Sequence, residues 1–163
     1  MQRIFHTPEG VRDIYNGECS QKHHLQAEIY KVFRSYGYEE IETPSIEYFE
    51  VFSKEVGTVP SRDLYKFFDR EGNTLVLRPD FTPSVSRACA TYFNPDQQVV
   101  TLCYTGNTFV NNSSYQGRLK ETTQIGVERI GDDSPEADAE LLAMTIESLL
   151  ASGLTEFQIS VGQ

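Results

Sequence analysis

The feature that most constrains the fold is a pair of apolar segments separated by a four-residue turn. Residues 64–69 and 74–78 have the apolar and aromatic composition of strands, and Arg70 to Asn73 form the turn between them. A connection this short joins antiparallel neighbours, because parallel strands need a crossover of about a dozen residues or more. The sequence therefore predicts a β-hairpin, and with it a sheet built largely from antiparallel strands.

Further strands follow the same pattern later in the chain. They are predicted at 99–104, 108–111 and 119–130, with a polar loop between the last two, and at 157–161, where Phe, Ile and Val alternate with other residues. The chain contains neither GxGxxG nor GxxxxGK[ST], the phosphate-binding signatures of parallel nucleotide-binding sheets. An antiparallel sheet is therefore favoured over a fold of that kind.

Helices are expected to pack on this sheet. Their predicted ranges are 20–36, 48–55, 82–93 and 134–153. Gly37 follows the first range as a C-terminal cap, and Thr82 and Ser134 begin the last two, each directly before a proline that favours the first turn. The expected core face of the last helix consists of Leu142, Ile146, Leu149 and Leu150. The order of helices and strands indicates an α+β fold, an antiparallel sheet flanked by helices.

Length and charge limit the classes of protein that the chain can belong to. A chain of 163 residues fits one domain, but the predicted strands are too few to complete such a sheet, so we expect an incomplete portion of a larger unit. The net charge is −10, and the 14 lysines and arginines are scattered rather than gathered in a basic stripe. This argues against nucleic acid as a partner, because phosphate binding normally uses clustered basic residues.

Neither a membrane segment nor a metal site is indicated. The chain has no apolar run long enough to span a membrane, and residues 1–6 lack the apolar core of a signal peptide, so we expect a cytoplasmic protein. Cys19, Cys89 and Cys103 form no CxxC pair. We therefore expect reduced thiols that are buried or half-buried, with neither a disulfide framework nor a zinc site.

Three clusters of polar residues are candidates for function. They are 8–14, 77–83 and 109–121, the last running on to Gln124 and Glu128. Each also has a purely structural interpretation: a turn with a charged pair, a helix N-terminus served by an acidic residue, and a solvated sheet face. On a strand, Gln124 and Glu128 lie on the same face, where an amide and a carboxylate can hold an amine or an imidazole.

Together, and in this order, the clusters resemble motifs of the histidyl-tRNA synthetase family of class II aminoacyl-tRNA synthetases. Pro8 to Asp13 matches P-x-G-x-R-D, and Leu77 to Thr82 resembles L-R-P-E-G-T with Asp80 in place of Glu. Motif 2 resembles Phe109 to Glu128, and its remnants are Phe109, Gln116, Gly117 and Arg118. The resemblance covers essentially the whole chain. It implies an N-terminal part, residues 1–163, of a synthetase-like core, without motif 3 and the C-terminal segment.

The resemblance also implies a pocket for histidine, together with a loss of its activation chemistry. The pocket residues would be Asp80, Thr82, Gln124 and Glu128. Synthetases of this class carry an arginine directly after the motif 2 phenylalanine, which holds the ATP α-phosphate, and an acidic residue two positions further on. Here these positions are Val110 and Asn112. Valine cannot make a charge-assisted hydrogen bond, and losing one such preorganised group typically costs ~10²–10³ in rate.

This combination resembles one branch of the family, the regulatory subunits of ATP phosphoribosyltransferase. The resemblance implies a non-catalytic protein without a cofactor, whose partner is the short-form catalytic subunit and which regulates histidine biosynthesis. It also implies a homodimer formed through residues 32–44, which resemble the class II dimer motif, and no binding of tRNA. Two alternatives stay open: a true histidyl-tRNA synthetase with a divergent motif 2, and another synthetase paralogue that acts as a binding module.

Overall fold

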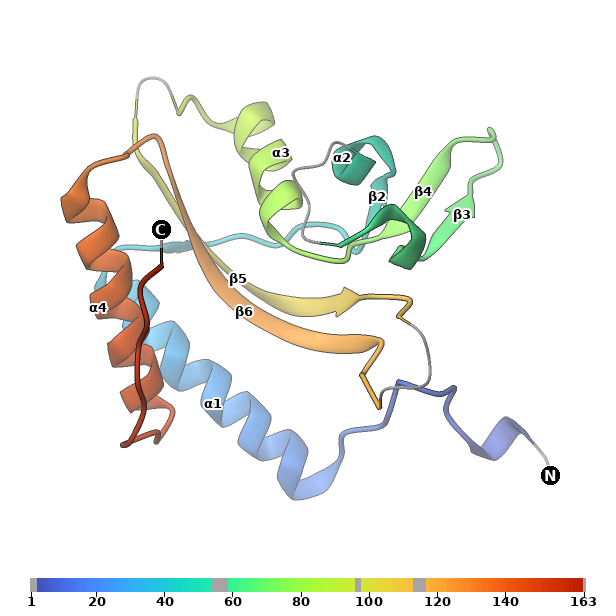
Figure 1. The fold of residues 1–163 in the computed structure, drawn as a ribbon, viewed down its shortest axis with the longest axis horizontal. Coiled ribbons are helices and arrows are strands. Elements are labelled where there is room, and N and C mark those ends of the chain that lie inside the picture. Colours follow the sequence, from blue (N-terminus) through green and yellow to red (C-terminus); the bar gives the residue numbers. More distant parts are fainter. Residues whose placement is uncertain (1–2, 54–58, 96–97, 113–116, 163) are drawn as a thin grey trace.

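The structure is a computed structural model that describes residues 3–53, 59–95, 98–112 and 117–162 (Figure 1). Its helices are α1 Asn16–Ser35, α2 Glu50–Ser53, α3 Thr82–Tyr92 and α4 Pro135–Ala151, with 3-10 turns at Arg3–Phe5 and Ser61–Asp63. Its strands are β1 Glu39–Glu40, β2 Ile46–Tyr48, β3 Lys66–Phe68, β4 Thr74–Leu77, β5 Val100–Phe109 and β6 Glu121–Ile130. These elements confirm the α+β class.

The strands form two three-stranded sheets, in the orders β1-β5-β6 and β2-β4-β3. The predicted hairpin is confirmed as the antiparallel pair β3–β4, with Phe67 opposite Leu75. The pairing is antiparallel throughout except between β1 and β5, which run parallel over two residues. The expectation of one sheet is thus corrected to two small sheets. The larger is dominated by the long β5–β6 hairpin.

The two strands predicted at 99–104 and 108–111 are in fact one strand, β5. Thr105, Gly106 and Asn107, which the prediction left out, pair with Ile125, Gln124 and Thr123 of β6. A glycine between two polar residues weakens the local strand signal, but pairing across the whole length of β6 stabilises the extended backbone. The hairpin therefore runs without interruption from Val100 opposite Ile130 to Phe109 opposite Glu121.

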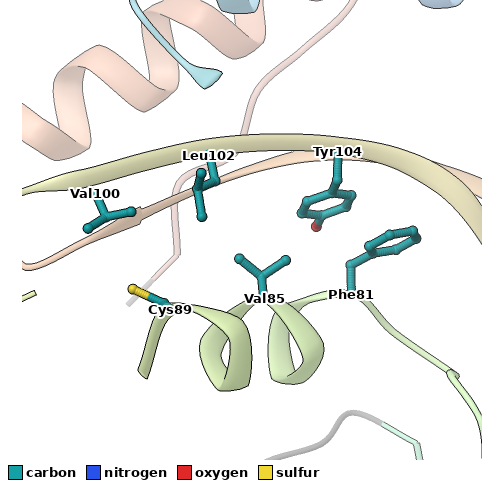
Figure 2. Close-up of a cluster of buried hydrophobic side chains, with 6 residues drawn as sticks. All are labelled: Phe81, Val85, Cys89, Val100, Leu102 and Tyr104. Atoms are coloured by element: carbon teal, nitrogen blue, oxygen red, sulfur yellow. The ribbon is translucent and has the colours of Figure 1, made fainter. Parts of the chain in front are cut away.

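The β5–β6 hairpin has α3 and the smaller sheet on one side and α1 and α4 on the other (Figure 1). Side chains of β5 alternate between these layers. Leu102 and Tyr104 pack with Phe81 and Val85 of the α3 segment, as Figure 2 shows, whereas Cys103 packs with residues of α1 and α4. Both faces of β5 are therefore covered, which makes it the central strand of the molecule.

The predicted helix caps are confirmed at two helices and corrected at the third. Gly37 follows α1 with φ of +83°, and the Ser134 hydroxyl accepts a hydrogen bond from Ala137 N at the start of α4. Thr82, however, is the first residue of α3 rather than its cap, since the N-cap position is Phe81. The Thr82 hydroxyl points to Glu128 instead, as described below.

The predicted core face of α4 is wrong. The buried residues of this helix are Ala137, Met144 and Ser148, and α4 packs on α1. Most of the predicted face is exposed: Leu142 by 38%, Ile146 by 38% and Leu150 by 52%. The helix carries apolar residues over more than one stripe, and periodicity alone cannot decide which stripe meets a neighbour.

The strand predicted at 157–161 is also absent, since these residues are in no strand. Phe157, Ile159 and Val161 are exposed, and none of the described strands pairs with this segment. An alternating pattern needs a hydrogen-bonded neighbour to become a strand. The predicted helix at 48–55 is shorter, at Glu50–Ser53, and its predicted end lies outside the described residues.

Candidate functional site

The four residues expected to form a pocket come together on the α3 side of the β5–β6 hairpin. The Thr82 hydroxyl donates a 2.6 Å hydrogen bond to Glu128 Oε1. Gln124 Nε2 makes a longer contact of 3.4 Å with Asp80 Oδ1, and this oxygen also accepts from the Phe81 backbone N–H at 2.7 Å. Thr82 and Glu128, 46 positions apart in the sequence, are thus joined, and the charge of Asp80 lies close enough to Glu128 to raise its pKa. The side chains of the expected carboxylate pocket therefore lie near one another.

A fifth member of this group, Tyr104, was not predicted. Its hydroxyl lies 3.4 Å from Glu128 Oε1 and 3.5 Å from Gln124 Nε2. It can therefore donate to the carboxylate and accept from the amide. Tyr104 pairs across the hairpin with Gly126, where a Cβ atom would lie 2.6 Å from the tyrosine oxygen. Gly126, between Gln124 and Glu128, is thus the sequence signal that the neighbouring strand β5 places a large side chain, Tyr104, opposite it.

Burial and neighbouring groups shift the pKa values of two members of this group. Burial raises the pKa of Glu128, while hydrogen bonds from Thr82 and Tyr104 lower it and the nearby charge of Asp80 raises it further. Burial also raises the pKa of the Tyr104 phenol, and the charges of Glu128 and Asp80 add to this effect. Two carboxylates that share a partly buried space are stabilised by a positive ligand, because it offsets both their desolvation and their mutual repulsion.

The remaining motif 2 positions lie elsewhere. Phe109 pairs with Glu121, at the opposite end of β6 from the end near Glu128. Gly117 has φ of +61° in the connection to β6, and Arg118 is exposed. Gln116 lies outside the described residues. The structure therefore does not bring the described motif 2 remnants into the carboxylate pocket.

Val110 and Asn112 lie just beyond β5 and are held by contacts with the strand that returns. The Val110 backbone N–H donates to Lys120 O at 2.9 Å, and Asn112 Nδ2 donates to Leu119 O at 3.3 Å. The segment 8–14 meets the same region, since Lys120 N donates to Gly10 O at 2.7 Å. These contacts continue the hairpin beyond the end of β5.

A cavity of about 640 Å³ lies against the other face of the hairpin. It is lined by Arg12 and Asp13 of the first cluster, by residues of α1, and by Thr123 and Ile125 of β6. Because Thr123 and Ile125 alternate with Gln124 along the strand, this cavity and the carboxylate pocket lie on opposite faces. Arg12 pairs with Glu18, which lies outside the first cluster, in the first turn of α1.

The segment expected to form a dimer interface contributes its apolar side chains to the chain's own core. Tyr38 is only 2% exposed. Tyr36 and Ile41 pack against the buried hydrophobic side chains on the two faces of β5. These side chains are therefore already used within one chain. A homodimer through residues 32–44 stays a prediction that rests on the resemblance.

Cys89 and Cys103 are buried, Cys19 is half-buried, and all three are free thiols, as predicted. Within the described ranges, no group of three or more His, Cys, Asp or Glu side chains is placed to hold a metal ion. Over the same ranges, no helix combines the length and the apolar content needed to cross a membrane.

Comparison with known proteins gives a consistent set of relatives. A family model described as Histidyl-tRNA synthetase matches residues 10–163. The chain is 49% identical over 158 residues to the ATP phosphoribosyltransferase regulatory subunit of Ruminiclostridium cellulolyticum, covering 97% of this chain and 38% of that protein. The protein of the same name from Acetivibrio thermocellus is 47% identical over the same shares. The chain thus spans less than two-fifths of the length of these relatives.

Two solved structures extend the likeness to three dimensions. An ATP phosphoribosyltransferase regulatory subunit/histidyl-tRNA synthetase from Bacillus halodurans aligns with a TM-score of 0.84 and 34% identity, over 94% of this chain and 39% of that one. The apo histidyl-tRNA synthetase of S. aureus aligns with a TM-score of 0.75 and 29% identity, over 92% of this chain and 35% of that one.

Proposed function

Because this chain belongs to the histidyl-tRNA synthetase family, we propose that the full-length protein is a non-catalytic regulatory subunit of ATP phosphoribosyltransferase that acts in histidine biosynthesis. In this proposal, residues 1–163 form the N-terminal part of a synthetase-like core. The observation that carries it is the contrast between the hydrogen-bonded group of Asp80, Thr82, Gln124 and Glu128 and the valine at the position after Phe109. The names of the relatives at 49% and 47% identity support the same assignment.

The pocket on the α3 side of the hairpin is proposed to bind histidine. The charges of Asp80 and Glu128 match a ligand with an ammonium group, and Gln124 and the Thr82 hydroxyl add hydrogen-bonding groups beside them. Such a ligand replaces the water lost on burial with charge-assisted hydrogen bonds, each worth about 1.5–3 kcal/mol. Histidine bound here would report the level of the pathway's end product to a catalytic partner.

Loss of histidine activation is the first expectation of this proposal. Val110 has no charge to place on the ATP α-phosphate, and Asn112 replaces an acidic group. We expect full-length protein to show no histidine-dependent exchange of pyrophosphate into ATP. Using the full-length protein ensures that a missing segment cannot explain a negative result. Exchange at the rate of a true synthetase, abolished by Gln124→Ala, would favour the synthetase alternative instead.

The partner is proposed to be the short-form catalytic subunit of ATP phosphoribosyltransferase, in the cytoplasm. A net charge of −10 without a basic stripe suits a protein partner better than tRNA, whose phosphates attract clustered basic residues. A homodimer through residues 32–44 belongs to the same proposal. Allosteric control then requires that histidine favour one state of the complex, with a coupling of typically ~1–3 kcal/mol.

Mixing the purified subunits tests the function directly. We expect the full-length protein to co-elute with the catalytic subunit on gel filtration and to change its rate of phosphoribosyl-ATP formation. We also expect histidine to inhibit the mixture more than the catalytic subunit alone. Bovine serum albumin at equal concentration controls for nonspecific stabilisation of the enzyme. Separate elution together with an unchanged rate would overturn the assignment.

A further inference from the structure

Arg78 lies at the seam between the two sheets and is almost completely buried, with 5% of its surface exposed. Its backbone N–H donates to Ser45 O at 2.9 Å, and its carbonyl accepts from Phe109 N at 3.0 Å. Its side chain donates to Asn107 O at 2.9 Å and to Thr43 O at 2.6 Å. Burial lowers the pKa of this guanidinium, whose hydrogen bonds go to the uncharged oxygens of Thr43, Pro44 and Asn107. The guanidinium plane is therefore fixed from two sides.

The fixed guanidinium is the first layer of a stack that leads to the pocket. Arg78 Cζ lies 3.9 Å from the centroid of the Phe81 ring, a cation–π contact. The Phe81 ring in turn stacks on Tyr104, with centroids 4.3 Å apart and planes 6° from parallel. Figure 2 shows these two rings facing each other between β5 and the start of α3. The last layer, Tyr104, carries the hydroxyl that contacts Glu128 and Gln124.

Two glycines make room for the stack, because a side chain at either position would overlap with it. A Cβ atom at Gly106 would lie 2.5 Å from Arg78 Nη2 and 2.8 Å from Phe81 Cζ. A Cβ atom at Gly126 would lie 2.6 Å from the Tyr104 oxygen. Separations this short are not tolerated without a shift of one partner. The first and last layers of the stack therefore each lie against a strand position that carries no side chain.

We propose that Arg78 is a positioning residue for the pocket: through Phe81 it fixes where the Tyr104 hydroxyl meets Glu128, and so sets the affinity for an amine- or imidazole-bearing ligand. The ligand class rests on the function proposed above, whereas the positioning of Tyr104 does not. The contacts that lead from Arg78 to the Tyr104 hydroxyl are the cation–π contact with Phe81 and the stacking of Phe81 on Tyr104. The effect of Arg78 passes through these two ring contacts, which distinguishes it from the residues that bind the ligand.

A purely structural role, in which Arg78 only joins the two sheets, makes a different prediction. Arg78→Lys separates the roles, because lysine keeps the positive charge and donors but has no planar face to stack on Phe81. Arg87→Lys is the matched control. Arg87 is a partly buried arginine on α3 that pairs with Glu47 at 2.8 Å and has no part in the stack. Both variants are expected to lose some thermal stability.

The experiment uses full-length protein labelled with 3-fluorotyrosine, and Tyr104→Phe identifies the fluorine resonance of Tyr104. We expect this resonance to move in Arg78→Lys, because the Phe81 ring that shields it is displaced, and to stay in place in Arg87→Lys. Histidine titrations by calorimetry should then show a dissociation constant about tenfold higher in Arg78→Lys alone, equivalent to one lost hydrogen bond.

A second variant covers the case in which Arg78→Lys does not fold. Gly106→Ala pushes on Arg78 and Phe81 from β5 and is expected to move the Tyr104 resonance and weaken histidine binding in the same way. An unmoved Tyr104 resonance, or wild-type affinity, in the folded variant would overturn the proposal. If wild-type protein itself binds no histidine, the proposed ligand is wrong, and the resonance alone decides whether Arg78 positions Tyr104.

Discussion

Replacing Phe81 with alanine is expected to lower the free energy of unfolding of the full-length protein by about 3–5 kcal/mol. The ring is 1% exposed, with Arg78 over one face and Tyr104 stacked on the other. Removing it deletes apolar contacts and leaves a cavity that neither neighbour can fill, because Arg78 is held by backbone carbonyls. Urea denaturation followed by circular dichroism measures the change.

Phe68→Ala is the matched control for this prediction. Phe68 is also a phenylalanine, but it lies on β3 and 73% of its surface is exposed. Its loss is expected to change the unfolding free energy by no more than about 0.5 kcal/mol, as is usual for surface positions. Equal urea midpoints for Phe81→Ala and wild type would show that the stack contributes little to the core.

Local signals in the sequence were sufficient for the hairpins and most of the helix ends. The turn from Arg70 to Asn73, the glycine after α1 and the Ser134 cap each act through their immediate neighbours, so no knowledge of the fold is needed to read them. Thr82 is the exception among the caps. Its hydroxyl has a competing acceptor in Glu128, which only the tertiary fold brings within reach.

Features that depend on a partner element could not be read in this way. The apolar residues of α4 fit more than one face, and the choice is made by packing against α1. The alternating segment 157–161 has the pattern of a strand, but a strand forms only where another offers its hydrogen bonds. The continuity of β5 through Gly106 is likewise imposed by its pairing with β6.

The candidate site likewise contains residues that the sequence indicated and one that only the fold revealed. The resemblance to the synthetase motifs implied Asp80, Thr82, Gln124 and Glu128 as a group, and their hydrogen bonds bring them together. Tyr104 was missed because an aromatic residue in a strand is read first as core, and it is indeed buried. Only the register, which sets Tyr104 opposite Gly126, shows that this core residue turns its hydroxyl to a carboxylate.

A carboxylate kept partly buried for a ligand costs the empty protein stability, and Glu128 makes this cost measurable. Its pKa in the folded protein is raised, chiefly by burial, so the folded state holds a proton that the unfolded state has released at the same pH. Its contribution to stability is therefore complete at low pH. It is lost as pH rises from the ordinary glutamate value of about 4.5 through the higher folded value.

Glu128→Gln is accordingly expected to have opposite effects on stability and on binding. Glutamine keeps the shape of the side chain and an oxygen for the Thr82 and Tyr104 hydroxyls, but it carries no charge. The stability of the variant relative to wild type should therefore rise with pH across that window and then level off. Histidine binding at neutral pH should weaken by roughly 10–100-fold, the equivalent of one charge-assisted hydrogen bond. Thermal unfolding from pH 4 to pH 8, roughly the range that brackets the window, and calorimetric titration measure the two effects.

Glu121→Gln provides the control, because Glu121 lies on the same strand but accepts from Asn107 on the opposite face of the hairpin. It should leave the affinity for histidine unchanged. In wild type, binding should strengthen as pH rises through the Glu128 pKa, since an ammonium group favours the ionised carboxylate. A Glu128→Gln variant that bound histidine as tightly as wild type would remove Glu128 from the ligand site. A variant less stable than wild type at neutral pH would mean that the ionised carboxylate is held by hydrogen bonds strong enough to offset its burial.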